Sequence, residues 1–155
     1  MTETTISRYY ADDHDRLDEL FRQYQSLKAV EWGQARNRFQ DFKRGLERHI
    51  AWEEDLLFPL FEAKTGMRDV GPIIVMRHEH QQIKYFLNLI DIELQEREQA
   101  PEPEEAGLLE VLEVHNWKEE HILYPAIDQC VTPEERRQVF DRMGVTVQDS
   151  TRSGL

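Results

Sequence analysis

The sequence is poor in the residues that cross-link or interrupt a chain. Cys130 is its single cysteine, which excludes an internal disulfide and any zinc or iron–sulfur site built from cysteines. Seven glycines and six prolines in 155 residues leave room for long helices. No stretch alternates apolar and polar residues between turn signals, as a half-buried strand does. The sequence therefore predicts an all-α protein.

Basic charge and long apolar runs are also scarce. The chain carries 19 lysines and arginines against 31 aspartates and glutamates, a formal net charge of -12. This balance argues against nucleic acid and against anionic membranes as partners. The longest aliphatic run is Ile73–Met76, far short of the ~20 residues that span a bilayer. Because the polar start, Met1–Thr5, lacks the pattern of a signal peptide, we expect a soluble cytoplasmic protein, as a monomer or a weak dimer.

Four long amphipathic segments fill most of the chain, with breaks near Val30–Gly33, Thr65–Gly71 and Gln99–Pro103. Short breaks between consecutive helices favour an antiparallel up-down-up-down four-helix bundle. Within each segment the core positions recur every three or four residues, the spacing of one helix face packed in a bundle. These positions are Tyr10, His14, Leu17, Phe21 and Tyr24; Phe42, Leu46, His49, Glu53, Leu56 and Leu60; Ile73, Met76, His80, Ile83, Leu87 and Ile90; and Leu108, Leu112, His115, Glu119, Ile122 and Ala126.

A short fifth helix is predicted near the C-terminal end. Thr132 is followed three positions later by Glu135, the arrangement of a capping box, and the helix should end near Gly144. The residues after it show no periodicity. We therefore expect one domain over residues 1–145 and a flexible tail over residues 146–155.

An internal repeat relates the two halves of the chain. The segment His49-Ile-Ala-Trp-Glu53-Glu-Asp-Leu-Leu-Phe-Pro59 matches His115-Asn-Trp-Lys-Glu119-Glu-His-Ile-Leu-Tyr-Pro125 at an offset of 66 residues. The same offset carries His14 to His80, and each of these is preceded by an acid, Asp13 or Glu79. Two helical hairpins of related sequence are thus predicted to face each other about a pseudo-twofold axis.

Six polar residues stand on these core stripes where a bundle favours Leu or Ile, namely His14, His49, Glu53, His80, His115 and Glu119. Burying such groups without partners costs several kcal/mol each, and a bound metal ion removes that cost. In each His-x-x-x-Glu pair the spacing of four places both side chains on one helix face, one turn apart. The six are therefore predicted to be metal ligands. The alternative is a metal-free network of His–Glu hydrogen bonds. In that case six buried polar groups related by symmetry would be energetically costly in so small a core.

Coordination numbers favour a pair of metal ions. Four imidazole nitrogens and four oxygens from two bridging glutamates supply about eight of the roughly twelve positions that two octahedra need. A shared oxo or hydroxo bridge then leaves about one open position on each metal. Imidazole and carboxylate ligands without thiolate suit iron, ahead of manganese or zinc. The predicted cofactor is two iron ions, oxo- or hydroxo-bridged.

With these motifs the sequence resembles the hemerythrin-like family, also called the HHE cation-binding domain, over about residues 8–130. The resemblance rests on Asp13-His14-Asp-x-Leu17, His49-x-x-x-Glu53-Glu54-x-x-Leu57-Phe58-Pro59, Glu79-His80 and His115-x-x-x-Glu119-Glu120-x-x-Leu123-Tyr124-Pro125. It implies an up-down four-helix bundle that holds a non-haem di-iron centre. Members of this family are linked to reversible oxygen binding, oxygen or nitric oxide sensing, peroxide chemistry, or iron–sulfur repair.

The sequence departs from the oxygen-carrier branch of that family, which resembles His-x-x-x-His on the third helix and His-x-x-x-x-Asp on the fourth. Here Lys84 stands four residues after His80 and Glu120 five after His115, so the fifth histidine is missing. This argues against a specialised oxygen carrier. The ligand set looks closer to bacterial di-iron proteins of nitrosative-stress response and iron–sulfur repair. Those typically carry an additional N-terminal cysteine-containing domain, for which this chain has no room, so we expect a stand-alone di-iron domain.

Three functions remain open. The first is binding or sensing of a small diatomic ligand, oxygen or nitric oxide, at the open di-iron site, where a sensor would need an unidentified protein partner. The second is an oxidoreductase that acts on peroxide, oxygen or nitric oxide, although the sequence shows no strong proton donor for it. The third is an iron donor or store linked to iron–sulfur repair. A ferritin-like oxidase fits less well because its Glu-x-x-His ligand pairs are absent.

Several residues beside the motifs receive other assignments. His78 and His121 are predicted to lie on the surface, turned away from the metal face. Glu54 and Glu120 are interpreted as solvated helix charges rather than as partners of the histidine N–H groups.

Two prolines fall inside helical patterns. Pro59 and Pro125 each remove one i→i−4 hydrogen bond and predict a kink just beyond the metal site.

Overall fold

The computed structural model describes residues 4–68, 70–96 and 99–145, which form helices joined by short connections. No strand occurs among these residues, which confirms the predicted all-α class. None of the helices in the described part of the chain is long and apolar enough to cross a membrane. The predicted tail over residues 146–155 lies outside the described residues.

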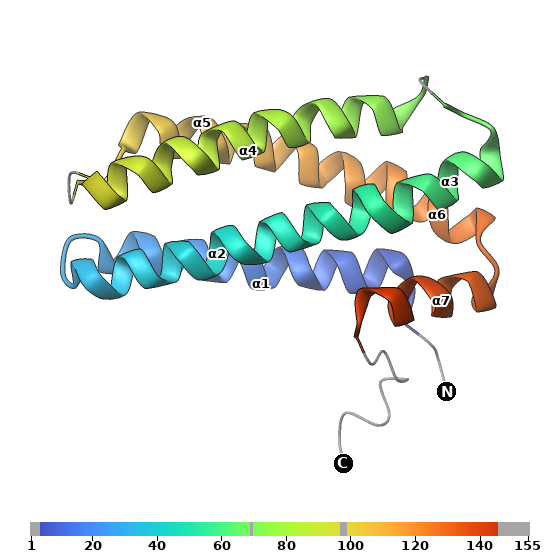
Figure 1. Cartoon of the computed structure of the whole chain (residues 1–155), viewed down its shortest axis with the longest axis horizontal. Coiled ribbons are helices and arrows are strands. Elements are labelled where there is room, and N and C mark those ends of the chain that lie inside the picture. The colour runs from blue at the N-terminus through green and yellow to red at the C-terminus, as the bar shows by residue number, and fades with distance from the viewer. Residues whose placement is uncertain (1–3, 69, 97–98, 146–155) are drawn as a thin grey trace, which may run out of the picture.

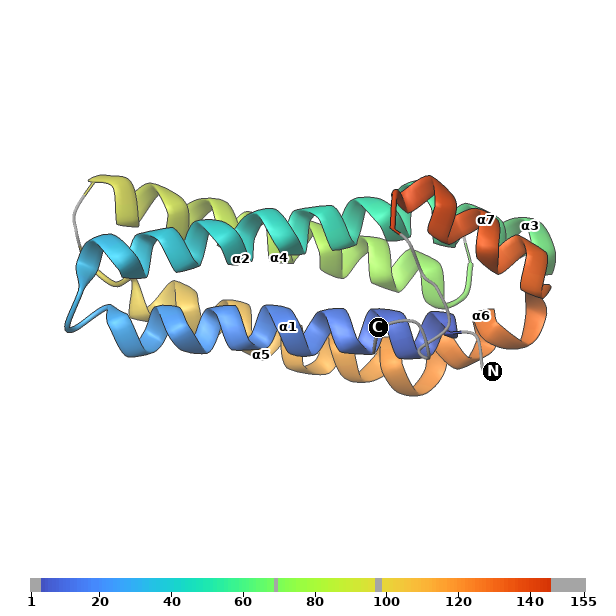
Figure 2. The same ribbon diagram turned by 90° about the horizontal axis from the view of Figure 1, so that it is seen from below.

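Four long helices lie side by side along one axis (Figure 1). Helix α1 (Ile6–Leu27) packs against α2 (Trp32–Trp52), and α4 (Pro72–Glu96) packs against α5 (Glu102–Lys118). The chain reverses at each connection, so the two members of each pair run in opposite directions (Figures 1 and 2). Polar side chains on all four helices can therefore meet at one level of the structure.

Two of the long helices contain a π-helical turn at corresponding places. Helix α2 continues through η1 (Glu53–Leu57) into α3 (Phe58–Thr65), and α5 continues through η2 (Glu119–Leu123) into α6 (Tyr124–Cys130). The amide of the residue before each proline bonds to a carbonyl five residues back, not four. Since proline has no N–H to donate, each helix accommodates it with this wider turn.

The extra residue in each π turn shifts the buried face by one position. A continuous α-helical spacing placed Ile122 in the core, and that prediction was wrong, because Ile122 is 52% exposed while Leu123 is 1% exposed. In the first half Leu56 is only partly buried, whereas Leu57 is fully buried. Leu60 and Ala126 are also partly buried, in keeping with the same shift, and the remaining predicted core positions are buried.

The apolar core consists of two clusters separated by a polar layer. One cluster contains Tyr10, Leu57 and Phe140 and lies at the end formed by α3, α6 and α7. The other contains Leu17 and Leu87 and fills the opposite part of the structure. The four buried histidines lie with Glu53 and Glu119 between the two clusters along the helices, which keeps them away from bulk water.

Helix α7 (Pro133–Met143) lies along the outside of the bundle near α3, where its buried residues Val139, Phe140 and Met143 join the first apolar cluster (Figure 2). Its N-terminus carries the predicted capping box, in which the side chain of Thr132 accepts from the amide of Glu135 and Glu135 accepts in return. It ends at Gly144, whose φ of 77° is a left-handed conformation that glycine adopts without strain. The predicted fifth helix is confirmed.

The shifted register can be tested with neighbouring substitutions. We expect Leu123→Ala to lower the free energy of unfolding by about 2–5 kcal/mol, because it empties a fully packed site. Ile122→Ala should cost less than about 1 kcal/mol, because half of that side chain already faces solvent. Urea denaturation of the two variants measures both values, and an equal or reversed order would contradict the π-shifted register.

Candidate metal centre

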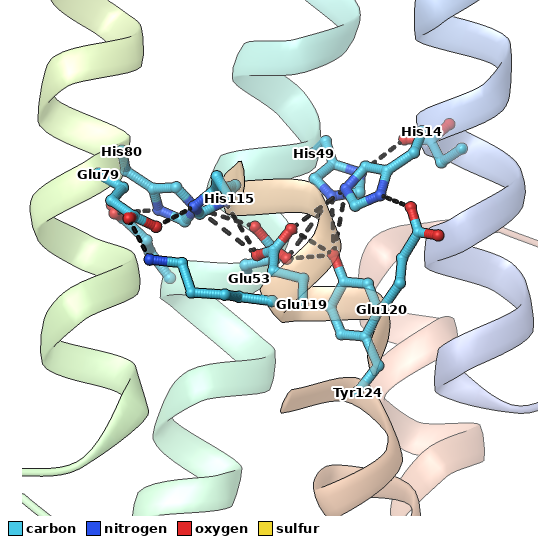
Figure 3. Close-up of polar contacts among 12 residues, drawn as sticks. His14, His49, Glu53, Glu79, His80, His115, Glu119, Glu120 and Tyr124 are labelled. Atoms are coloured by element: carbon cyan, nitrogen blue, oxygen red, sulfur yellow. Dashed lines mark hydrogen bonds and ion pairs between the residues drawn. The ribbon is translucent and has the colours of Figure 1, made fainter. Parts of the chain in front are cut away.

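The structure brings the six predicted ligands together in one buried layer (Figure 3). None of them is more than 3% exposed. Each long helix contributes one histidine, and each π turn contributes one glutamate; the residues are His14, His49, His80 and His115 with Glu53 and Glu119. This equal contribution from the two halves of the chain matches the pseudo-twofold arrangement that the repeat predicts.

The two glutamates lie between two pairs of histidines. On one side, Nε2 of His80 is 3.1 Å from Oε1 of Glu53, and Nε2 of His115 is 3.2 Å from Oε2 of Glu119. Glu53 and Glu119 each still have a second carboxylate oxygen, which faces the opposite way.

Those second oxygens face the other histidine pair. Nε2 of His14 is 3.1 Å from Oε1 of Glu119, and Nε2 of His49 is 3.5 Å from Oε2 of Glu53. Each half of the layer thus presents two imidazole nitrogens and two carboxylate oxygens, and both carboxylates extend from one half to the other.

A second set of carboxylates holds the far side of every imidazole ring. In each histidine Nδ1 lies at hydrogen-bond distance from one acid: 2.7 Å for His14 and Glu120, 2.9 Å for His49 and Asp13, 2.8 Å for His80 and Glu54, and 2.9 Å for His115 and Glu79. These partners obey the same 66-residue offset as the histidines. Such contacts fix the orientation and the tautomer of a metal-binding imidazole.

The assignment of Glu54 and Glu120 to solvated helix charge was therefore wrong. Both carboxylates are mostly shielded, with 21% and 33% of the side chain exposed, because each reaches across to a histidine of a neighbouring helix. Their repetition in the sequence was the signal for this role. Asp13 and Glu79 were noted as acids next to histidines, but which ring each one contacts depends on the packing of two helices.

The outer hydrogen bonds hold each ring so that its other nitrogen, Nε2, faces the inner carboxylates. When a neutral imidazole donates from Nδ1, its Nε2 carries a lone pair, and here that lone pair faces a carboxylate oxygen. Among the residues that the structure describes, Oε1 of Glu53, Nε2 of His80 and Oε2 of Glu119 are buried with no hydrogen-bond partner. A cation between these atoms would satisfy all three. The donor set fits a metal that accepts nitrogen and oxygen ligands.

Without a metal ion, the charge of the layer favours protons on the histidines. Burial by itself would lower the pKa of His80, but the nearby carboxylates of Glu119, Glu53 and Glu54 raise it to about 11. Burial likewise opposes protonation of His14, yet Glu119 and Glu120 raise its pKa to about 10. The carboxylates thus give the layer a negative potential, which keeps His80 and His14 protonated when no metal is bound.

Tyr124 is a seventh polar residue in the layer that the sequence analysis did not assign to the site. Its hydroxyl oxygen lies 2.6 Å from Oε2 of Glu53 and 2.8 Å from Oε1 of Glu119, and either carboxylate can accept its proton. Burial, with the charges of Glu119 and Glu53, raises the pKa of Tyr124 well above its ordinary value. The only sequence signal for Tyr124 is the change from Phe58 to tyrosine at the equivalent position of the repeat.

The other histidines lie away from the layer. His78 and His121 are exposed, as predicted. The ring of His121 stacks on Trp117 at 4.6 Å, and both line a pocket of about 500 Å³ on the α1 and α5 side. Glu120 also lines this pocket, so the outer carboxylate of His14 is one point where the layer approaches solvent.

The outer carboxylates give a prediction about metal affinity. We expect Glu54→Ala to weaken metal binding by about 10–100-fold, because His80 loses the acceptor that orients its ring. Competition with a chelator of known affinity measures the change. Glu110→Ala, at an exposed position of α5, is the control, and equal affinities for the two variants would contradict the role given to Glu54.

The raised histidine pKa values predict how stability depends on pH without metal. His80 and His14 keep protons in the folded state that they release near 6.5 when unfolded, so their contribution is complete below about 6.5. It disappears as the pH rises through their folded values of about 10 and about 11. The urea midpoint of the metal-free protein should therefore fall between about pH 7 and about pH 9. A midpoint that stays level or rises over this range would refute the expectation.

Comparisons with known proteins identify the family of the chain. The family model described as the hemerythrin HHE cation binding domain matches residues 5–127. The iron-sulfur cluster repair protein YtfE of Edwardsiella ictaluri is 33% identical over 91 residues, which cover 55% of this chain and 41% of that protein. The protein of the same name from Musicola paradisiaca is 42% identical over 50 residues, covering 30% of this chain and 22% of that protein.

The chain thus spans less than half the length of these curated relatives. No solved structure matches it significantly. The family model, however, covers most of the chain, including all six predicted ligands and their outer carboxylates. This chain belongs to the hemerythrin HHE cation-binding domain family.

Proposed function

We propose that this chain is a non-haem di-iron protein that binds a small diatomic ligand, oxygen or nitric oxide, at a buried centre. The proposed ligands of the two irons are His14, His49, Glu53, His80, His115 and Glu119. An antiparallel up-down-up-down four-helix bundle is the proposed scaffold, and a shared oxo or hydroxo bridge completes the centre. The observation that carries the proposal is that each of the two buried carboxylates faces a histidine on either side.

The donor count supports exchangeable positions rather than a closed structural site. Each half offers two nitrogens and two oxygens from the six residues, and an octahedral metal accepts about six donors. When bound, an iron pair supplies exchangeable coordination positions and a change of oxidation state. The protein contributes the rest: Asp13, Glu79, Glu54 and Glu120 hold the imidazole rings in place, and the apolar clusters on either side exclude water.

A second candidate, iron donation in iron–sulfur repair, is favoured by a different observation. The curated relatives carry the name iron-sulfur cluster repair protein, and the best-covered alignments include 91 residues of this chain. A role in repair requires that iron leaves the centre. The partly exposed carboxylates of Glu54 and Glu120 are the places from which a chelating group would first compete with a histidine.

Iron content tests the centre itself. We expect two irons per chain in the purified protein and the loss of the pair in Glu53→Ala and Glu119→Ala, because each carboxylate serves both halves. His78→Ala, a change of an exposed histidine outside the layer, should keep both irons. Elemental analysis with the visible spectrum measures this result. An absent metal, a single zinc, or a pair of irons retained in Glu119→Ala would overturn the proposal.

Three further measurements on the loaded protein separate the candidate functions. A spectral change that follows the addition and removal of oxygen or nitric oxide supports reversible binding. Steady consumption of peroxide supports an oxidoreductase instead. Transfer of iron to a protein that lacks its iron–sulfur cluster supports the repair role.

A further inference from the structure

The pseudo-twofold symmetry of the metal layer breaks at one pair of residues. The offset of 66 residues matches histidine with histidine, glutamate with glutamate, and acid with acid in the outer set. It matches Phe58 with Tyr124, and both are fully buried. Each follows a layer glutamate by five residues, and the π turn between them brings the fifth residue towards the face that the glutamate occupies.

The hydroxyl oxygen of Tyr124 lies at the spacing of a further metal ligand. Neighbouring donor atoms around one octahedral metal are about 3 Å apart when the metal–donor bonds are about 2.1 Å long. The Tyr124 oxygen is 3.2 Å from Nε2 of His49 and 3.4 Å from Nε2 of His14. Its distances to the carboxylate oxygens of Glu53 and Glu119 are 2.6 and 2.8 Å. It therefore neighbours all four donor atoms of one half, as Figure 3 shows.

Within the described parts of the chain, no residue places an equivalent oxygen in the opposite half. The ring of Phe58 stacks on the imidazole of His80, with centroids 5.7 Å apart and an angle of 10° between the planes. A phenyl ring donates nothing to a metal. The three buried atoms that lack a hydrogen-bond partner in the layer, on Glu53, His80 and Glu119, all face this half. One half thus holds five donor atoms, and the other holds four.

We propose that the phenol oxygen of Tyr124 is a ligand of the iron held by His14 and His49. With the shared bridge, this iron then has about six donors, so the exchangeable position lies on the iron held by His80 and His115. The phenol proton leaves for solvent as the iron takes its place. This inference rests on the proposed iron pair, and it makes the two irons unequal: one closed by Tyr124, the other covered by Phe58.

The spectrum of the ferric protein tests this ligand directly. A phenolate bound to ferric iron gives a visible charge-transfer band, and excitation in that band enhances the ring vibrations of tyrosine in the Raman spectrum. We expect both signals in the native protein and their loss in Tyr124→Phe with two irons retained. Tyr10→Phe is the matched control, because Tyr10 is buried beside the site but its hydroxyl bonds to Sδ of Met143. That variant should keep both signals.

Azide binding to the ferric protein tests where the open position lies. We expect a single azide per chain in the native protein and a second one in Tyr124→Phe, which frees the closed iron. Phe58→Tyr places the same hydroxyl in the other half, and it should strengthen the charge-transfer band and abolish azide binding. If Tyr124→Phe does not fold, the spectrum of the native protein and the azide binding of Phe58→Tyr still test the Tyr124 ligand.

The possible failures are distinguishable. A native protein with two irons and no tyrosine signals would overturn the Tyr124 ligand while leaving the di-iron proposal intact, and Tyr124 would then be only a hydrogen-bond donor. Signals that persist in Tyr124→Phe, or unchanged azide binding in a Phe58→Tyr protein that holds two irons, would overturn it as well. A native protein without an iron pair would refute the proposed function and this inference together.

Discussion

Two carboxylates buried with no exposed surface, those of Glu53 and Glu119, impose the main constraint on this structure. A buried carboxylate is expensive unless opposite charge or hydrogen-bond donors surround it. The four long helices meet this requirement by each placing a histidine at the level of the two glutamates. The apolar residues then divide into two clusters on either side of the layer, and they keep water from competing with the contacts inside it.

Charge alternates outward from the centre. The histidines face the two inner carboxylates with one nitrogen and an outer carboxylate with the other. Three of the outer carboxylates in turn meet a cation near the surface: Arg16 with Asp13, Lys118 with Glu79, and Lys84 with Glu54. Ion pairs whose cation lies near the surface contribute little to stability by themselves. Their effect is to keep the outer acids ionised and oriented towards the imidazole rings, which is the condition for Nε2 to face inward as a donor atom.

The π turns connect the prolines of the repeat to the chemistry of the layer. An α-helix would turn the fifth residue after each glutamate away from the glutamate's own face, as the predicted register assumed. The wider turn before Pro59 and Pro125 instead brings Phe58 and Tyr124 next to the buried histidines and glutamates. Because only one of these two positions carries a hydroxyl, the two halves of an otherwise symmetric polar layer differ.

The sequence by itself determined the helical class and the six residues of the buried layer. It also determined how these residues correspond between the two halves of the repeat. Those features depend on local periodicity and on a repeat, both of which can be counted along the chain. Only the tertiary structure decided that Leu123 rather than Ile122 is buried, because a π turn changes the register through a hydrogen bond that no α-helical spacing contains. It also decided that Glu54 and Glu120 hold histidines, since their partners belong to other helices 26 and 106 residues away along the chain. The place of Tyr124 among four donor atoms depends on both effects, a shifted register and the packing of separate helices, and so it became visible only in three dimensions.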